Sequence, residues 1–253
     1  MSENGYVKSE ILNNVARIEF YHPQSNSLPS KVLSELAETI TSVSNDPSVN
    51  VIKLESAGRR AFCAGASFDE LIAINDFDNG KKFFMGFANV INAMRKSPKI
   101  IVVSVQGKAV GGGVGLIAAA DYALATKDCG VKLSELALGI GPFVVGPAVE
   151  RKIGKSAFAQ MSIDYDWYSA EWALTKGLYN HIYDNIDFMH EQVDVLVNKL
   201  ANSSQEAMAE LKKIIWEGTE NWDSLLPERA EISGRLVLSE FTKNYIENFK
   251  NKK

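Results

Sequence analysis

Residues 99–120 read KIIVVSVQGKAVGGGVGLIAAA, and this stretch decides the fold. Lys99 to Val105 is an apolar run rich in β-branched residues, which predicts a strand covered on both faces in a sheet that is parallel in part. Gly111-Gly112-Gly113 makes a turn, and the small and apolar residues from Val114 to Ala120 predict a buried helix. A strand, a glycine turn and a helix in this order are typical of an α/β protein, in which such turns carry the chemistry.

The same arrangement of strand and small-residue turn occurs earlier in the chain. Val49 to Glu55 predicts a short strand, and Ala61 to Ala66 (AFCAGA) predicts a turn. Closer to the amino end, residues 6–21 have a central asparagine pair and predict a β hairpin. Apolar residues at helical spacing follow Ser30, which we expect to cap that helix. The amino-terminal half therefore predicts strands, turns and helices in alternation.

Apolar spacing predicts the remaining elements as well. We expect strands at 122–125 and 130–132, and helices at 83–94, 148–153, 191–200, 205–216 and 227–249. Beyond residue 170 no further glycine-rich turn appears, and the helices are amphipathic. We therefore expect an α/β core over residues 1–190 and a helical region over residues 191–253.

Composition excludes several classes of protein. The 253 residues include 27 Lys and Arg against 31 Asp and Glu, so the net charge is −4 and no positive field favours nucleic acid. The longest uncharged stretch, 136–149, is 14 residues long, whereas a membrane span needs about 20. The polar residues 1–8 and the two isolated cysteines, Cys63 and Cys129, favour a reducing, cytoplasmic location.

Familiar catalytic motifs are absent. The three histidines have no metal-ligand spacing, so we expect no metal site. The sequence has no GxSxG nucleophile elbow, no Gly-Lys-Ser/Thr after the glycine triplet, and no GxGxxG after the first strand. Hydrolysis by a serine nucleophile, nucleotide hydrolysis and hydride transfer are therefore disfavoured.

Two small-residue turns and one carboxylate remain as candidates for chemistry. Each turn exposes backbone N–H groups near a helix start, and two such groups aimed at one point would stabilise an oxyanion. Glu135 lies in the apolar run VKLSELALG at 131–139, where it could move protons. Taken alone, the turns fit tight packing as well as they fit a site.

Five ordered segments resemble the crotonase (enoyl-CoA hydratase/isomerase) superfamily: residues 22–28, 61–66, 107–113, 134–139 and 170–177. This resemblance covers nearly the whole chain. It implies an α/β fold with a spiral core of ββα turns and a carboxyl-terminal helical oligomerisation region. It further implies an acyl-CoA thioester as substrate, with coenzyme A as part of that substrate and no prosthetic group. The assembly it implies is a homo-trimer or a dimer of trimers, in which Arg235 and Lys243 reach a neighbour's site.

The resemblance also assigns roles to residues. The backbone N–H groups of Ala66 and Gly112 would form the oxyanion hole, and Glu135 would be the catalytic acid/base. The carbonyl of Ala64 would meet the adenine amino group of coenzyme A. Three cations next to the turns, Arg59, Arg60 and Lys108, are candidates for its phosphates, with solvated surface charge as the other interpretation.

One departure from the family pattern bears on the reaction. A typical hydratase has a first glutamate directly after the glycine-rich loop, but Gly115 stands there, which leaves Glu135 alone. An enoyl-CoA hydratase is the favoured interpretation, with a branched or glutaconyl-type thioester suggested by residues 114–116 and 142–145. The alternatives are an enoyl-CoA isomerase that uses the single Glu135, other enolate chemistry such as decarboxylation, and a non-catalytic acyl-CoA-binding subunit. Ser67 replaces a usual aspartate, and we expect it to cap a helix.

Overall fold

A six-stranded sheet forms the centre of the computed structural model, which describes residues 5–250. Its strands, in spatial order, are β1 (Tyr6–Leu12), β2 (Val15–Tyr21), β3 (Val51–Ser56), β5 (Ile100–Val105), β7 (Tyr122–Thr126) and β9 (His181–Tyr183). β1 and β2 form the expected antiparallel hairpin, with Asn13 and Asn14 both at positive φ in its turn. Every other pairing in this sheet is parallel, so the prediction of a partly parallel sheet is confirmed.

A second, smaller sheet contains three short parallel strands, β4 (Ala61–Cys63), β6 (Lys108–Val110) and β8 (Val131–Lys132). Each short strand follows a long one in the chain, so that β3 leads to β4, β5 to β6 and β7 to β8. Helices come after the first two of these pairs. The predicted spiral of ββα turns is therefore confirmed.

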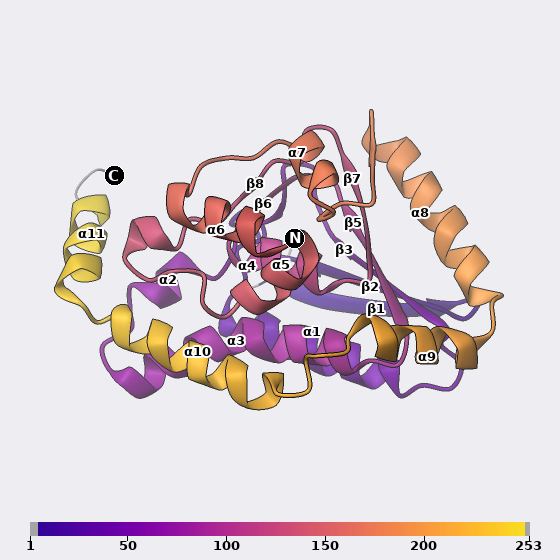
Figure 1. Ribbon diagram of the computed structural model, residues 1–253, viewed down its shortest axis with the longest axis horizontal. Coiled ribbons are helices and arrows are strands. Elements are labelled where there is room, and N and C mark those ends of the chain that lie inside the picture. Colours follow the sequence, from indigo (N-terminus) through magenta and orange to yellow (C-terminus); the bar gives the residue numbers. More distant parts are fainter. Residues whose placement is uncertain (1–4, 251–253) are drawn as a thin grey trace.

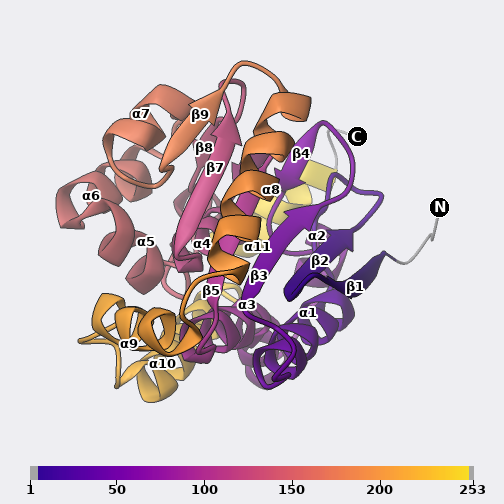
Figure 2. The ribbon, with the colours of Figure 1, turned by 90° about the vertical axis from the view of Figure 1, so that its right-hand side faces the viewer.

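The described residues also form helices, which lie between the strands and after the last of them. They are α1 (Ser30–Ser44), α2 (Phe68–Leu71), α3 (Phe77–Lys96), α4 (Gly112–Ala119), α5 (Gly146–Ile153), α6 (Lys155–Asp164), α7 (Ala170–Thr175), α8 (Ile186–Ala201), α9 (Gln205–Ile215), α10 (Trp222–Leu236) and α11 (Glu240–Lys250). α8 crosses the outer face of the sheet, while α1 and α3 lie on the opposite side and α10 runs along α3 (Figures 1 and 2). A 3₁₀ turn, η1 (Leu136–Leu138), precedes α5.

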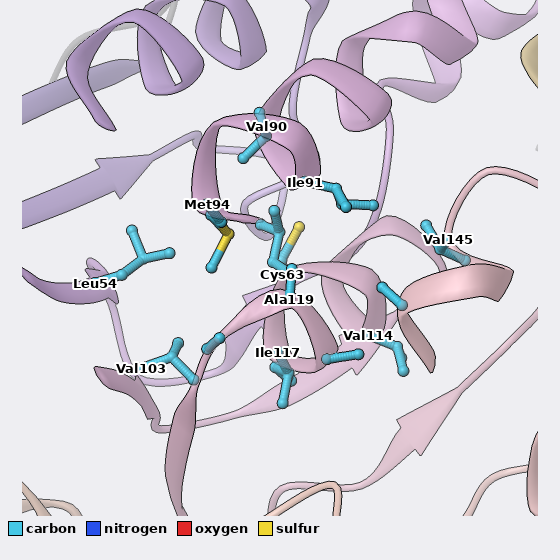
Figure 3. Packing of buried hydrophobic residues seen from close by; sticks show 14 of the residues in the cluster. Leu54, Cys63, Val90, Ile91, Met94, Val103, Val114, Ile117, Ala119 and Val145 are labelled. Atoms are coloured by element: carbon cyan, nitrogen blue, oxygen red, sulfur yellow. The ribbon is translucent and has the colours of Figure 1, made fainter. Parts of the chain in front are cut away.

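The strand β5 is buried along its whole length, as its β-branched run predicts. Ile101, Val103 and Val105 point into the main core, and Ile100 and Val102 pack under α8. Every residue of α4 is buried as well. Figure 3 shows how side chains from this helix meet those of α3 and the neighbouring strands.

Some predicted helix limits are wrong. Ser30 does not cap α1: Pro29 holds the cap position, and the Ser30 hydroxyl instead donates to Glu70 Oε2 at 2.6 Å. The helix predicted at 83–94 begins at Phe77, because Asp76 accepts a hydrogen bond from the N–H of Asn79 and so caps it. Local capping chemistry outside the apolar pattern sets this limit.

The helix predicted at 227–249 is two helices, α10 and α11. The chain turns at residues 237–239, where Val237 is buried and Ser239 Oγ accepts the N–H of Thr242. The expected division at residue 190 falls inside α8, which packs on the core sheet.

Two glycines face each other where α3 crosses α10. A Cβ on Gly80 would lie 2.9 Å from the carbonyl oxygen of Gly234, whereas a Cβ on Gly86, also in α3, would meet only the Leu33 side chain. Gly80→Ala should therefore lower the free energy of unfolding by about 2 kcal/mol, since backbone must shift. Gly86→Ala should change it by less than about 1 kcal/mol, because helix propensity offsets the crowding. Equal effects of the two variants in urea unfolding would contradict this packing.

Candidate active site

A cavity of about 630 Å³ brings together segments that are far apart in the sequence. Four of the sequence-predicted site residues line it: Ala64, Ala66, Gly112 and Glu135. They stand just after β4, β6 and β8. Because these three strands are parallel neighbours, their carboxyl ends meet at one edge of the small sheet and place the following residues together.

The loop after β4 leaves the backbone N–H of Ala66 unused. Leu28 flanks this loop with a parallel bridge, in which its N–H donates to Gly65 O at 2.7 Å and its carbonyl accepts from Ser67 N at 3.0 Å. Ser27 Oγ donates to Ala66 O. Within residues 5–250, the N–H of Ala66 has no acceptor in the protein.

The N–H of Gly112 is free for a different reason. Gly112 is the first residue of α4, and the first N–H groups of a helix have no intrahelical partner. No acceptor for it is found in the described part of the chain. A Cβ on Gly65 would lie 3.8 Å from Gly112 N, so the two loops are in contact. Two unpaired amide donors thus lie at one cavity, as an oxyanion hole requires.

The carboxylate of Glu135 lies directly against Gly111. A Cβ on Gly111 would be only 2.7 Å from Glu135 Oε1, and the φ of 53° at this residue also favours glycine. The N–H of Gly111 donates to Lys132 O at 2.9 Å, which ties the turn to the strand that leads to Glu135. The glycine turn and the carboxylate therefore form one packed unit.

Burial controls the charge of Glu135. Its Oε2 atom is shielded from solvent and has no hydrogen-bond partner among residues 5–250. Burial raises the pKa of Glu135 to about 7, although the N–H groups of Glu135 and Ser134 counter part of this rise. At neutral pH both the acid and the carboxylate are populated, which suits a group that must accept and return a proton.

The rest of the cavity wall is mostly apolar. Its apolar side chains include Leu71, Phe83, Phe84, Phe87, Ile140, Val144 and Val145. The ring of Phe87 covers Gly112, where a Cβ would lie 2.2 Å from its Cζ. Aromatic and aliphatic side chains thus surround the two amides, which lowers the local dielectric and strengthens their interaction with charge.

The space in which a side chain at residue 115 would lie is filled by Val145. A Cβ there would lie 2.6 Å from Val145 Cγ1 and 3.7 Å from Ile91 Cδ1 (Figure 3 shows Val145 and Ile91 near α4). No carboxylate fits at residue 115 without displacing Val145. Asp69 is the other carboxylate that lines the cavity, and it accepts a hydrogen bond from Gln24 Nε2 at 2.9 Å.

The three predicted phosphate-binding cations do not line this cavity. Arg59, Arg60 and Lys108 line a separate hollow of about 220 Å³. Among the described residues that line the main cavity, Lys132 is the one with a cationic side chain. Sequence reasoning missed Lys132, although its place three residues before Glu135 was a signal. It also missed Tyr245 of α11, for which the sequence has no local signal.

The expectation for Ser67 has a clear outcome. Ser67 caps α2, because its Oγ accepts the N–H of Glu70 at 3.3 Å, as expected. Residues 5–250 contain no group of three or more His, Cys, Asp or Glu side chains that could hold a metal ion. No helix in that range is both long and apolar enough to span a membrane.

Comparison with known proteins gives consistent matches over most of the chain. Residues 10–248 match the family described as Enoyl-CoA hydratase/isomerase. A short-chain-enoyl-CoA hydratase of Clostridium acetobutylicum is 27% identical over 250 residues, which cover 94% of this chain and 95% of that one. A carnitinyl-CoA dehydratase of Proteus mirabilis is 28% identical over 206 residues, 79% of this chain and 76% of that one.

Solved structures share the fold. An enoyl-CoA hydratase from Mycobacterium avium superposes with a TM-score of 0.86 at 25% identity, covering 100% of this chain and 98% of that one. An enoyl-CoA hydratase from Bacillus halodurans superposes with a TM-score of 0.89 at 24% identity, covering 96% and 99%.

The raised pKa of Glu135 predicts a pH-dependent stability. The folded protein holds this proton up to a pKa of about 7 and the unfolded chain only up to about 4.5. The resulting stabilisation is present below pH 4.5 and is lost as pH rises through 7. Glu135→Gln removes the titration. Relative to wild type, its free energy of unfolding should therefore rise by on the order of 2 to 3 kcal/mol from pH 5 to pH 8.

Glu150 provides the control for this measurement, since it is exposed on α5. Glu150→Gln is measured by urea unfolding over the same pH range and reports the effect of exchanging an exposed glutamate for glutamine. An equal pH dependence for the two variants, each relative to wild type, would show that the Glu135 carboxylate is solvated and would contradict the raised pKa.

Proposed function

The chain belongs to the enoyl-CoA hydratase/isomerase family, and from this membership we propose that it is an enoyl-CoA hydratase. It adds water across the α,β double bond of an acyl-CoA thioester. One observation carries the proposal: the Glu135 carboxylate lies against Gly111, in the cavity that the free N–H groups of Ala66 and Gly112 also line. Coenzyme A enters as part of the substrate, and the reaction needs no prosthetic group.

The proposed chemistry uses the two amides to hold the thioester oxygen and Glu135 to move one proton. The thioester oxygen accepts hydrogen bonds from Ala66 N–H and Gly112 N–H. Glu135 takes a proton from water while the water oxygen bonds to C3, and the π electrons move onto the thioester oxygen as an enolate. The two amides stabilise that negative charge. Glu135 then gives its proton to C2, so one carboxylate serves as base and then as acid on one face of the substrate.

An isomerase is the second candidate. The observation that supports it is that the Val145 side chain fills the space beside Gly115. Glu135 is therefore the carboxylate beside the glycine turn. One carboxylate suffices to carry a proton between C2 and C4 through the same enolate. A non-catalytic acyl-CoA-binding subunit is the third. Two unpaired amides and a carboxylate with a pKa of about 7 argue for turnover instead.

The acyl group is proposed to be short or branched, with a glutaconyl-type chain as a specific candidate. The apolar wall around Phe83, Phe87 and Val144 supports a hydrocarbon chain. A glutaconyl group also carries a carboxylate, which would need a cation, and Lys132 is available at the same cavity.

The remaining contacts of coenzyme A are proposed from the loop positions. The carbonyl of Ala64 would accept the adenine amino group, and Arg59, Arg60 and Lys108 would have to reach the phosphates from their separate hollow. We further propose a homo-trimer or a dimer of trimers, located in the cytoplasm. Exposed apolar side chains on the late helices support such assembly: Phe188, Val195, Leu211, Ile214 and Phe241.

The test is an absorbance assay of the conjugated thioester with purified protein. Crotonyl-CoA and 3-methylglutaconyl-CoA should lose absorbance as water adds, and Glu135→Gln should lower kcat by about 10²-fold to 10⁴-fold. A gain of absorbance with a 3-enoyl-CoA, without loss for the other two, would establish the isomerase instead. Binding of acyl-CoA with no turnover of any substrate would favour the non-catalytic subunit.

Ala66→Pro tests the oxyanion hole. Proline removes the N–H, and no hydrogen bond within the described protein is lost because that N–H has no acceptor there. Loss of one donor should lower kcat by on the order of 10²-fold or more. Ala66→Gly keeps the N–H and serves as control, with kcat expected within about tenfold of wild type. A folded Ala66→Pro variant with wild-type kcat would refute this role.

A further inference from the structure

The backbone of Glu135 is held in a short, closed turn. The carbonyl of Glu135 accepts the N–H groups of Leu138 and Ile140, each at 3.1 Å, and Leu136 O accepts Gly139 N at 2.9 Å. These bonds fix residues 135–140 relative to one another. They leave the carbonyl of Leu138 to be satisfied from outside the turn.

That outside partner is Thr242 of α11. Its hydroxyl is fully buried and lies 2.8 Å from Leu138 O. Two other atoms are near: Ser239 Oγ at 3.1 Å and Leu236 O at 3.1 Å. Leu236 O already accepts Ser239 N, and Ser239 Oγ can donate to Thr242 Oγ1. The single hydroxyl proton of Thr242 is therefore best used by Leu138 O.

The helix α11 also packs closely on the end of this turn. Gly139 has a φ of 78°, and a Cβ there would lie 2.5 Å from Phe241 Cδ1 and 2.9 Å from Thr242 Oγ1. Tyr245, one helical turn further, lines the main cavity. Figure 1 shows α11 at one end of the molecule, beyond α10. The contact with η1 thus connects the carboxyl-terminal helix with the segment that carries Glu135.

We propose that Thr242 is a positioning residue for Glu135. Its hydroxyl ties the turn at 135–140 to α11 and so holds the Glu135 carboxylate against Gly111. This inference rests on the proposed role of Glu135 as the acid/base. It goes beyond that role because it gives α11, more than 100 residues away in sequence, a specific function in the reaction.

Thr242→Val keeps the shape of the side chain and removes the hydroxyl. Leu138 O then loses the donor that the described chain supplies, and the turn can shift to find water. A displacement of about 1 Å at a catalytic group costs on the order of 10²-fold in rate. We expect kcat to fall by about 10-fold to 100-fold, with KM changed by less than about threefold. Thr242→Ser restores the hydroxyl and should recover most of the loss.

A second readout does not require turnover. Access of water in Thr242→Val should bring the pKa of Glu135 down toward its ordinary value. Two differences in the free energy of unfolding are compared over pH. One is between Thr242→Val and Thr242→Val/Glu135→Gln, and the other is between wild type and Glu135→Gln. The first difference should then depend less on pH than the second. Asp69, Lys132 and Tyr245 line the same cavity and are present in all four proteins, so the comparison isolates the changes at residues 135 and 242.

Thr219 provides a matched control. It is buried, its hydroxyl donates to Trp216 O at 2.7 Å, and it lies between α9 and α10 outside the lining of the cavity. Thr219→Val should lower stability with kcat and the Glu135 pH dependence unchanged. Equal kcat losses in the two valine variants, or no recovery in Thr242→Ser, would overturn the positioning role.

The two readouts separate the two proposals. If wild type turns over none of the thioesters, the proposed function fails, whereas the stability comparison still reports on how Thr242 holds Glu135. If wild type is active and Thr242→Val changes neither kcat nor the pH dependence, the positioning role alone is wrong.

Discussion

The glycine triplet at 111–113 is the constraint on which the site depends, because three different groups occupy the space where side chains would be. Added Cβ atoms would lie 2.7 Å from Glu135 Oε1, 2.2 Å from Phe87 Cζ and 2.4 Å from Cys63 O, respectively. Backbone, aromatic ring and carboxylate therefore meet at contact distance around one turn. This close approach aligns the start of α4 with the loop after β4. It also shields the Oε2 atom of Glu135, for which the described part of the chain supplies no hydrogen-bond partner.

The spiral of strands explains how such a contact arises. Three short parallel strands end at the same edge, so each pass of the chain delivers one loop to the cavity. The large sheet supplies the rigidity, since both faces of β5 are buried. A shielded carboxylate in an apolar wall opposes folding once it ionises, and a buried core of this size can offset that cost.

Local sequence patterns predicted the scaffold better than the site. The hairpin at the asparagine pair, the buried strand β5 and the glycine turn follow from turn chemistry and β-branched residues, which act over a few positions. The candidate phosphate-binding cations were chosen by proximity in sequence to the two turns, and in the fold they line a hollow separate from the main cavity. Arg60 and Lys108 stand at or before the start of their three-residue strands, while the site residues follow their ends, about 10 Å away. Tyr245 and Thr242 reach the site or its supporting turn through packing between distant elements, which periodicity does not encode.

Gly115 stands where a typical hydratase has its first glutamate, and this difference shapes the chemistry of the remaining carboxylate, Glu135. Two neighbouring carboxylates would titrate as a coupled pair, one of them held protonated by the charge of the other. Here Val145 fills the space beside Gly115, and apolar burial shifts the pKa of Glu135 to about 7. A single group that is half ionised at neutral pH can accept a proton and return it with little driving force lost in either direction. In the proposed reaction both proton transfers would depend on how firmly this one side chain is held, and the contacts of Gly111 and of the turn at 135–140 supply that restraint.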